Sequence, residues 1–202
     1  MEMIKRLEKN RSYRRFGKRK IQAKELCELI RAAGLTASAG NLQKLRFVPV
    51  CGESCKKVFP HLRWAGYLPD WQGPAEGERP TGYMILLYPT GTSGQPCATT
   101  DGKFLVGVDV GIAAQSILLT ATDMGLGGCM LASIDRPALT VALGLDATAW
   151  EIALVIALGE PREEVRIVGV TDGNIKYYRD AQGVHYVPKR SVRELTVYPH
   201  QE

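Results

Sequence analysis

The sequence predicts an α+β fold in which helices cover a central sheet. Two unbroken apolar runs, 82–88 and 151–158, predict strands that are buried on both faces. Two segments with apolar residues at helical spacing, 24–34 and 109–124, predict helices. The elements alternate without the steady rhythm of a doubly wound sheet, and no glycine-rich nucleotide motif follows a strand.

The first elements follow from local signals. Residues 1–9 predict a short entry helix, and the helix that starts at Lys24 has a natural stop at Gly34. A polar loop of small residues, Thr36–Gln43, then leads into a strand at Arg46–Cys51.

Residues 52–81 are rich in proline and glycine and predict a surface loop or short helices. Long irregular segments in compact domains are often lids or binding loops. Tryptophans in such a segment can equally pack against the core. The large aromatic residues of this segment are Trp64, Tyr67 and Trp71. Two interpretations remain open for them: they form a lid or pocket wall, or they pack in the core.

The most apolar helix is predicted to run from Asp109 to Met124, with Asp109 as its N-cap. Its almost uncharged outer face indicates burial on more than one side, in the core or in a subunit interface. A strand at 130–133 and a helix that begins near Asp135 follow. The chain turns polar after Gly159 and ends in a basic tail, 189–197, which we expect to be extended.

Composition predicts one soluble domain over residues 1–202, with 45% hydrophobic and 23% charged residues. The longest apolar candidate, 151–158, is shorter than the roughly 20 residues that a bilayer span needs. The N-terminal segment has no apolar signal region, so we expect a cytoplasmic protein whose five cysteines are free thiols. No cysteine or histidine spacing predicts a metal site.

The sequence contains no familiar hydrolytic motif, neither GxSxG nor HExxH. Its histidines, His61, His185 and His200, have no partner that local sequence suggests. The absence of an evident nucleophile or base points to a binding protein, or to an enzyme whose cofactor carries the chemistry.

Two basic clusters, 11–20 and 189–193, contribute most to a net charge of +5 that is unevenly placed. They are either solvated faces or groups that converge on a phosphate. A nucleic-acid-binding module built on the first cluster is a further alternative. It is disfavoured because neither interleaved aromatics nor a helix-turn-helix pattern accompanies the cluster.

Four blocks in order resemble the nitroreductase family: Asn10–Phe16 (NRSYRRF), Ser38–Gln43 (SAGNLQ), Gly125–Cys129 (GLGGC) and Pro188–Ser191 (PKRS). The resemblance covers nearly the whole chain. It implies a nitroreductase-like α+β fold, with a central mixed sheet flanked by helices, in an intertwined homodimer. It also implies that FMN is bound at the dimer interface.

The resemblance assigns cofactor-binding roles to residues of all four blocks. Those expected at the FMN phosphate are Arg11, Ser12, Lys189 and Arg190, and Arg14 matches the basic residue near the N1/O2 edge of the ring. The loop that reaches the flavin from the partner subunit matches Ser38, Ala39, Asn41 and Gln43. Gly127 and Gly128 match a turn over the N5/O4 region of the ring.

The implied activity is a ping-pong reaction. NADH or NADPH gives hydride to flavin N5 and leaves, and an acceptor then binds in the same pocket and takes the electrons. A nitroaromatic, a quinone or another flavin would be the acceptor, and no protein acid or base is assigned. Reductive dehalogenation and a flavin-consuming reaction on the same scaffold are alternatives. The sequence departs from the family pattern at Asn10 and at Lys44–Leu45, where arginine and Pro-Trp are common.

Overall fold

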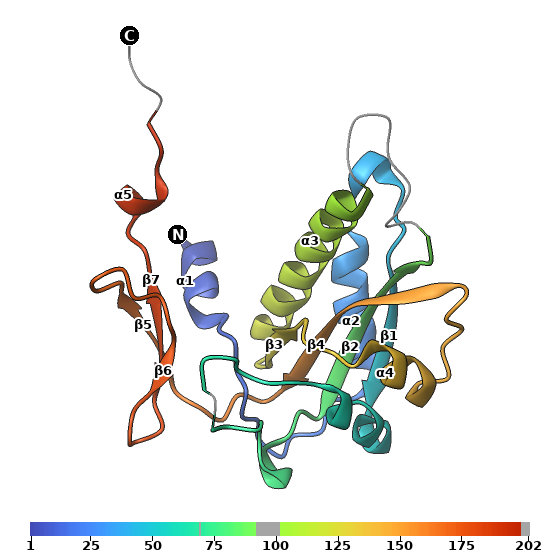
Figure 1. The fold of residues 1–202 in the computed structure, drawn as a ribbon, viewed down its shortest axis with the longest axis horizontal. Helices are drawn as coiled ribbons and strands as arrows, with labels where there is room; N and C mark the ends of the chain where they lie inside the picture. Colours follow the sequence, from blue (N-terminus) through green and yellow to red (C-terminus); the bar gives the residue numbers. More distant parts are fainter. Residues whose placement is uncertain (69, 92–101, 199–202) are drawn as a thin grey trace.

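A computed structural model describes residues 1–68, 70–91 and 102–198 of the chain (Figure 1). Its centre is a sheet of four strands in the order β1-β2-β4-β3, and each pairs antiparallel with its neighbour. The strands are β1 (Arg46–Cys51), β2 (Gly82–Pro89), β3 (Gly127–Leu131) and β4 (Trp150–Gly159). Cys97, His200 and most of the polar connection predicted for 89–100 lie outside the described residues.

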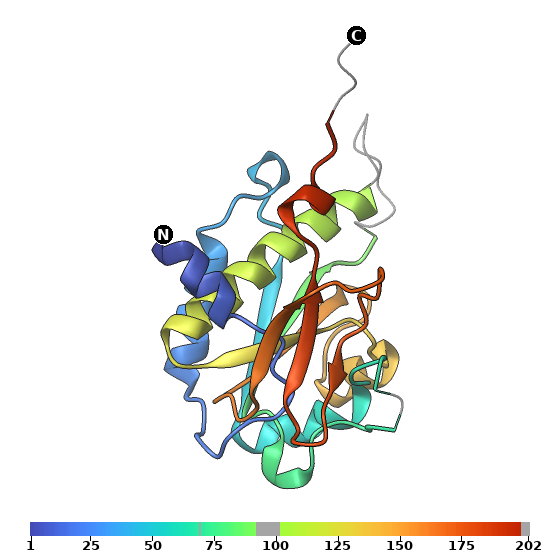
Figure 2. The ribbon, with the colours of Figure 1, turned by 90° about the vertical axis from the view of Figure 1, so that its left-hand side faces the viewer.

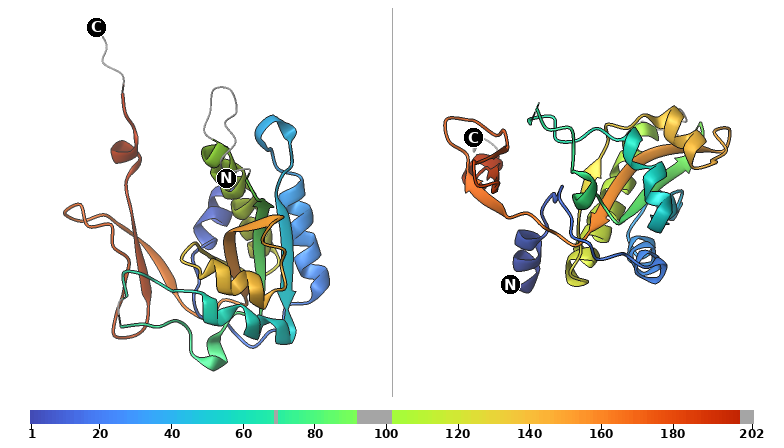
Figure 3. Two further views of the ribbon diagram at one scale, coloured as in Figure 1. Left: turned by 45° about the vertical axis from the view of Figure 1, so that its right-hand side comes forward. Right: turned by 90° about the horizontal axis from the view of Figure 1, so that it is seen from below.

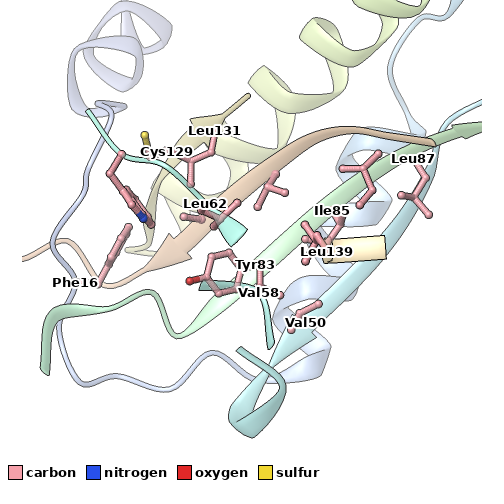
Figure 4. Packing of buried hydrophobic residues seen from close by; sticks show 14 of the residues in the cluster. Phe16, Val50, Val58, Leu62, Tyr83, Ile85, Leu87, Cys129, Leu131 and Leu139 are labelled. Atoms are coloured by element: carbon pink, nitrogen blue, oxygen red, sulfur yellow. The ribbon is translucent and has the colours of Figure 1, made fainter. Parts of the chain in front are cut away.

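The unbroken apolar sequence of β2 reflects burial on both faces of the sheet. Tyr83, Ile85 and Leu87 point to one apolar cluster, whereas Met84 and Leu86 point to another. This alternation follows from the period of two in a strand. Figure 4 shows the first cluster, in which the side chains of β2 meet residues from the loops and from β1 and β3.

Helices cover one face, and short irregular elements cover the other (Figure 3). The first face packs against α2 (Ala23–Gly34) and α3 (Gly102–Asp123), and α1 (Glu2–Lys9) joins α3 through an ion pair of 2.7 Å between Arg6 and Asp123. The second face is covered by η2 (Gly52–Lys57), η3 (Phe59–His61) and α4 (Arg136–Ala142), and a further short 3-10 helix, η4 (Glu76–Glu78), precedes β2.

The predicted start of the long helix is wrong. α3 begins at Gly102, so Asp109 lies inside the helix and does not cap it. The buried Asp109 carboxylate instead accepts a hydrogen bond of 2.9 Å from the backbone N–H of Ala39. The sequence did not predict the first turns of α3, because Gly102 and Gly107 lie there and glycine has a low helix propensity.

α3 also contains the longest apolar stretch of the described chain, which corrects the choice of 151–158. Residues Leu105–Asp123 are long and apolar enough to cross a membrane by length and composition, and 33% of that stretch is buried inside the chain. Ala113, Ala114 and Ile117 are buried in the cluster under the sheet. The helix thus packs on the sheet along one side, and helices of a protein core can pass the same test of length and composition.

A second sheet, which the sequence analysis missed, stands beside the main body (Figure 2). Its strands are ordered β5-β7-β6, with β5 (Val165–Gly169) parallel to β7 (His185–Lys189) and β6 (Tyr178–Arg179) antiparallel to it. The mixed pairing expected of the central sheet thus occurs in this second sheet, whereas all pairs of the central sheet are antiparallel. The tail predicted to be extended instead forms a short helix, α5 (Val192–Leu195), which Ser191 and Glu194 cap reciprocally.

The basic N-terminal segment runs beside β3, which begins at Gly127, three residues before the predicted 130–133. The N–H of Tyr13 donates to the carbonyl of Gly128 at 3.0 Å, and the N–H of Gly17 donates to Glu160 at 2.7 Å. The Tyr13 ring occupies the space that a Cβ on Gly127 would need. Glycine at this position therefore lets the N-terminal segment approach the sheet.

A Gly127→Ala substitution should destabilise the protein by about 1–3 kcal/mol, because the added Cβ overlaps the Tyr13 ring. Chemical denaturation measures this loss. Gly34→Ala is the matched control, since a Cβ there meets nothing within 4 Å and should change stability by less than about 0.5 kcal/mol. Equal stabilities for the two variants would contradict the packing described for Tyr13.

Candidate functional site

Two adjoining cavities lie where the N-terminal segment, β3 and the second sheet meet. The larger, here called the aromatic cavity, has a volume of about 700 Å³ and a wall that includes Trp64, Trp71 and the segment 129–133. The smaller, the basic cavity, has about 390 Å³ and is lined by Arg11, Ser12, Gln115, His185 and Lys189 among others. Three residues line both cavities: Arg14, Met130 and Tyr177.

The basic cavity gathers positive charge from both ends of the chain. Arg11 and Arg14 come from the segment beside β3, and Lys189 comes from the end of β7. Among the described residues that line it, none is acidic. Burial lowers the pKa of Arg11, but a guanidinium remains charged in proteins. Such a cavity suits a phosphate, whose oxygens accept charge-assisted hydrogen bonds.

A buried carboxylate, Glu163, fixes the N-terminal segment against the second sheet. It accepts hydrogen bonds from the backbone N–H of Arg14 and, at 3.2 Å, from that of Arg15. The guanidinium of Arg179 on β6 forms an ion pair of 2.9 Å with its other oxygen. Both side chains of this pair are largely buried, so water weakens the attraction little.

The Arg14 side chain is also buried, and its guanidinium has three neighbours. Nη1 lies 3.1 Å from Nε2 of His185 and 3.3 Å from the carbonyl oxygen of Ser12, and the group stacks over the Tyr177 ring at 4.7 Å. Burial, together with the charges of Arg14 and Arg179, lowers the pKa of His185 to about 4. The imidazole is therefore neutral at pH 7.

Of the seven buried side-chain N and O atoms of the described residues that have no hydrogen-bond partner, four belong to residues that line the cavities. They are Arg11 Nε, Arg14 Nε, Trp64 Nε1 and His185 Nδ1. Arginine and tryptophan nitrogens are donors, and an unpaired buried donor costs about 1–3 kcal/mol. Their concentration around one pair of cavities indicates a polar ligand that supplies the missing acceptors.

The aromatic segment 52–81 contributes to the wall in part. Trp64 is buried in the core cluster and also lines the aromatic cavity, so both interpretations of this side chain hold. Trp71 lines the cavity edge-on to Trp64, with ring centroids 6.5 Å apart, and Arg179 stacks on it at 4.9 Å. Tyr67 is not a lining residue, and its ring packs against Tyr177 at 5.0 Å.

The structure brings together part of the predicted phosphate site. Arg11, Ser12, Arg14 and Lys189 line one cavity. Arg190, predicted at the phosphate, is exposed outside the cavities and lies 3.8 Å from Glu194.

The glycine pair lies elsewhere than predicted. Gly127 and Gly128 do not form a turn but are buried inside β3 and line neither cavity. The residues that follow them, Cys129–Ser133, form the wall of the aromatic cavity. The glycines thus allow close packing behind the wall.

The loop 38–43 is remote from both cavities of its own chain. It lies beside α3 near Asp109, and Ser38 and Gln43 border a separate cavity of about 150 Å³ (Figure 1). Gln43 donates its N–H to Ser38 Oγ at 3.1 Å, and Asn41 has a left-handed φ of 54°. Within one chain Ser38, Ala39, Asn41 and Gln43 therefore do not join the other predicted site residues.

Sequence reasoning missed several lining residues, notably Gln115, Tyr177 and His185 in the basic cavity. A signal for His185 was present. His185, Val187 and Lys189 alternate along β7 and all face this cavity, as the period of two predicts for a strand. Tyr177 gave no such signal, because it precedes a strand of two residues.

The first basic cluster does not form one solvated face. Arg14 is buried, Arg15 lies 3.5 Å from Glu78, and Arg19 forms an ion pair of 2.6 Å with Glu25. Part of the charge that a nucleic-acid phosphate would contact is thus already paired within the chain.

Four cysteines are described, Cys27, Cys51, Cys55 and Cys129, and all four are free. Burial raises the pKa of the Cys55 thiol to about 11. No three His, Cys, Asp or Glu side chains of the described residues are grouped so that they could hold a metal ion.

Comparison with known families gives one match. The model of the Nitroreductase family matches residues 7–72 and 93–160, which together make up more than half of the chain. No curated protein matches the sequence.

Solved structures share the fold. A nitroreductase family protein of Streptococcus pneumoniae TIGR4 has a TM-score of 0.68 at 16% identity, over 84% of this chain and 95% of its own. A protein of Desulfovibrio desulfuricans, described as a nitroreductase in complex with FMN, has a TM-score of 0.68 at 19% identity, over 100% and 99%. The enone reductase CLA-ER has a TM-score of 0.65 at 20% identity, over 85% and 94%.

The lowered pKa of His185 makes stability depend on pH. The unfolded chain takes up a proton near pH 6.5, whereas the folded chain resists until about pH 4. Neutral His185 therefore contributes about 3 kcal/mol to the free energy of unfolding above pH 6.5, and this contribution is lost as the pH falls toward 4. Denaturant unfolding of the ligand-free protein at pH 7 and pH 4 measures this loss.

His185→Leu is the diagnostic variant, because it removes the titrating group. Its stability should fall less between pH 7 and pH 4 than that of the unsubstituted protein, by about 3 kcal/mol. Gly34→Ala, which removes no titratable group, is the control and should keep the full fall. An unchanged fall in His185→Leu would show that carboxylates alone cause the acid sensitivity.

Proposed function

The chain belongs to the nitroreductase family, and on that premise we propose that it is an FMN-dependent oxidoreductase. One observation carries the proposal: a cavity lined by three cations adjoins a larger cavity with aromatic walls, and Arg14 lines both. FMN combines a phosphate with a flat ring. When bound, it supplies two-electron chemistry, accepting hydride from NADH or NADPH and passing it to an acceptor.

The residues present fit the two ends of this cofactor. Arg11, Ser12 and Lys189 would hold the phosphate, since they offer two cations and a hydroxyl in one cavity. The unpaired Nε–H of Arg14 would serve a polar edge of the ring. As a fixed cation in a largely buried place, Arg14 would stabilise the negative charge that two-electron reduction leaves on the ring.

The aromatic cavity supplies the place for the nicotinamide and, in turn, for the acceptor. Trp64 and Trp71 give part of its wall aromatic faces, which pack well against flat molecules. A nitroaromatic, a quinone or a conjugated carbonyl compound fits these walls, and one protein of this fold is named an enone reductase. The protein's part is orientation and electrostatics, and no residue is assigned as an acid or base.

The complete site is proposed to form in a homodimer. α3 exposes Val108 and Ile112 to 40% and 37%, on a helix whose other side packs against the sheet. Gly107 and Gly111, one helical turn apart, have open space beside them and would let a second helix approach closely. The loop 38–43, remote from its own cavities, would then reach those of the partner.

The purified protein should be yellow, and its flavin absorption should bleach when NADH or NADPH is added without oxygen. Lys189→Met should weaken FMN binding roughly 10- to 100-fold, because a charge-assisted contact to the phosphate is lost. Riboflavin, which has no phosphate, should bind both proteins equally. Fluorescence quenching measures both affinities.

Arg190→Met is the matched control for the phosphate site. Its guanidinium is exposed outside the cavities, so its FMN affinity should stay within about threefold of the unsubstituted protein. A colourless protein that takes up no FMN would refute the proposed function. A Lys189→Met protein that loses FMN and riboflavin equally would refute the assignment of the basic cavity to the phosphate.

Ile112→Glu should convert the dimer to a monomer and release FMN, because a buried charge at the interface has no partner. Light scattering measures the mass, and absorption measures the bound flavin. Val141→Glu on α4, where Val141 is 81% exposed, is the control and should remain a yellow dimer. A monomeric mass for the unsubstituted protein at micromolar concentration would contradict the shared site.

A further inference from the structure

His185 is a buried polar group in the wall of the basic cavity. It begins β7, has no exposed surface, and its Nε2 lies 3.1 Å from Nη1 of Arg14. A guanidinium has donors and no acceptor. A hydrogen bond at this distance therefore requires an Nε2 without a proton, and the imidazole proton of the neutral form must sit on Nδ1.

The charges around His185 favour the same form. Arg14 and Arg179 are the cations that face it, and Tyr177 packs on the ring with centroids 5.3 Å apart. Glu163 is the nearby carboxylate, but its oxygens already accept from Arg179 and from two backbone N–H groups. Glu164 contributes its carbonyl oxygen, which accepts the backbone N–H of His185 at 2.9 Å.

The hydrogen bond to His185 decides the orientation of the Arg14 guanidinium. Without the hydrogen bond to His185, the Arg14 guanidinium would keep two contacts: the Ser12 carbonyl oxygen, 3.3 Å from Nη1, and the Tyr177 ring on which it stacks. Neither contact prevents rotation about the long side chain. With it, Nη1 is directed toward β7, while Nε stays unpaired beside both cavities.

We propose that His185 is a positioning residue: its neutral imidazole, protonated at Nδ1, fixes Arg14 so that the cation faces the ligand. The consequence for the flavin rests on the proposed function, whereas the protonation of His185 does not. A fixed cation stabilises the reduced flavin more than the oxidised one. Loss of the hydrogen bond should therefore favour the oxidised form.

The first test reads the tautomer directly. Nitrogen-15 correlation spectra of the ligand-free protein at pH 7 should show His185 with its proton on Nδ1, and the His185→Gln spectrum assigns the signal by its loss. A proton on Nε2, or a doubly protonated ring, would overturn the proposal. This measurement needs neither FMN nor turnover.

The second test compares flavin midpoint potentials. His185→Leu, which offers no acceptor, should favour the oxidised flavin at least tenfold, a fall of about 30 mV for a two-electron couple. His185→Gln, whose amide oxygen can accept from Arg14, should restore most of the potential. Tyr186→Phe, the next residue on β7 and not a lining residue, should leave it unchanged.

The outcomes separate the two proposals. If the unsubstituted protein binds no FMN, the proposed function fails, and the tautomer still decides the role of His185. If FMN binds and His185→Leu keeps the original potential, His185 does not position Arg14. If His185→Leu does not fold, the tautomer and the His185→Gln variant decide whether His185 positions Arg14. A flavin potential in His185→Gln at least 30 mV below that of the unsubstituted protein would count against the acceptor role.

Discussion

The ion pair between Glu163 and Arg179 is the interaction on which the site depends, because the second sheet has no apolar core of its own. Among the described residues of β5, β6 and β7, the one that is fully buried is His185, a polar residue. A small sheet without an apolar face is not independently stable. Glu163 joins it to the main body by tying Arg179 on β6 to the backbone of Arg14 and Arg15, and Arg179 also stacks on Trp71.

This polar junction keeps the two sheets apart. An apolar contact between them would bring their side chains together at packing density and close the space. The junction instead holds two arginines, one carboxylate and a neutral imidazole, with Tyr177 as the aromatic contact. One positive charge remains uncompensated in this count. Burying a charge without a partner is costly, so the anionic cofactor of the proposed function would stabilise this junction when it binds.

The sequence predicted those elements whose apolar pattern is local. The strands predicted at 46–51 and 82–88 from their hydrophobicity are confirmed as β1 and β2. The helix predicted to begin near Asp135 is α4, and Asp135 is its N-cap. The second sheet could not be found in this way, because its strands are short and mostly exposed and the residues that fix it are distant along the chain. Glu163 and Arg14, for example, are 149 residues apart.

The same distinction applies to the site. Arg11, Arg14 and Lys189 were predicted from residue type and motif, and the structure places them in one cavity. Tyr177 and His185 were missed, because their roles come from the ring and the guanidinium that they touch.

The loop 38–43 shows why one chain is an incomplete description of the proposed site. Asn41 and Gln43 have left-handed φ values of 54° and 47°, a conformation that costs a residue such as glutamine on the order of 1 kcal/mol. Asp109 inside α3 holds the loop through the N–H of Ala39, so its shape is maintained without a ligand. Both amide side chains remain exposed to solvent. Within the chain, the Gln43 amide donates to the Asn41 side chain at 3.2 Å, and neither amide contacts the two cavities. In the proposed dimer, α3 would carry the loop toward the partner's cavities, where the amides meet the polar edge of a bound ring.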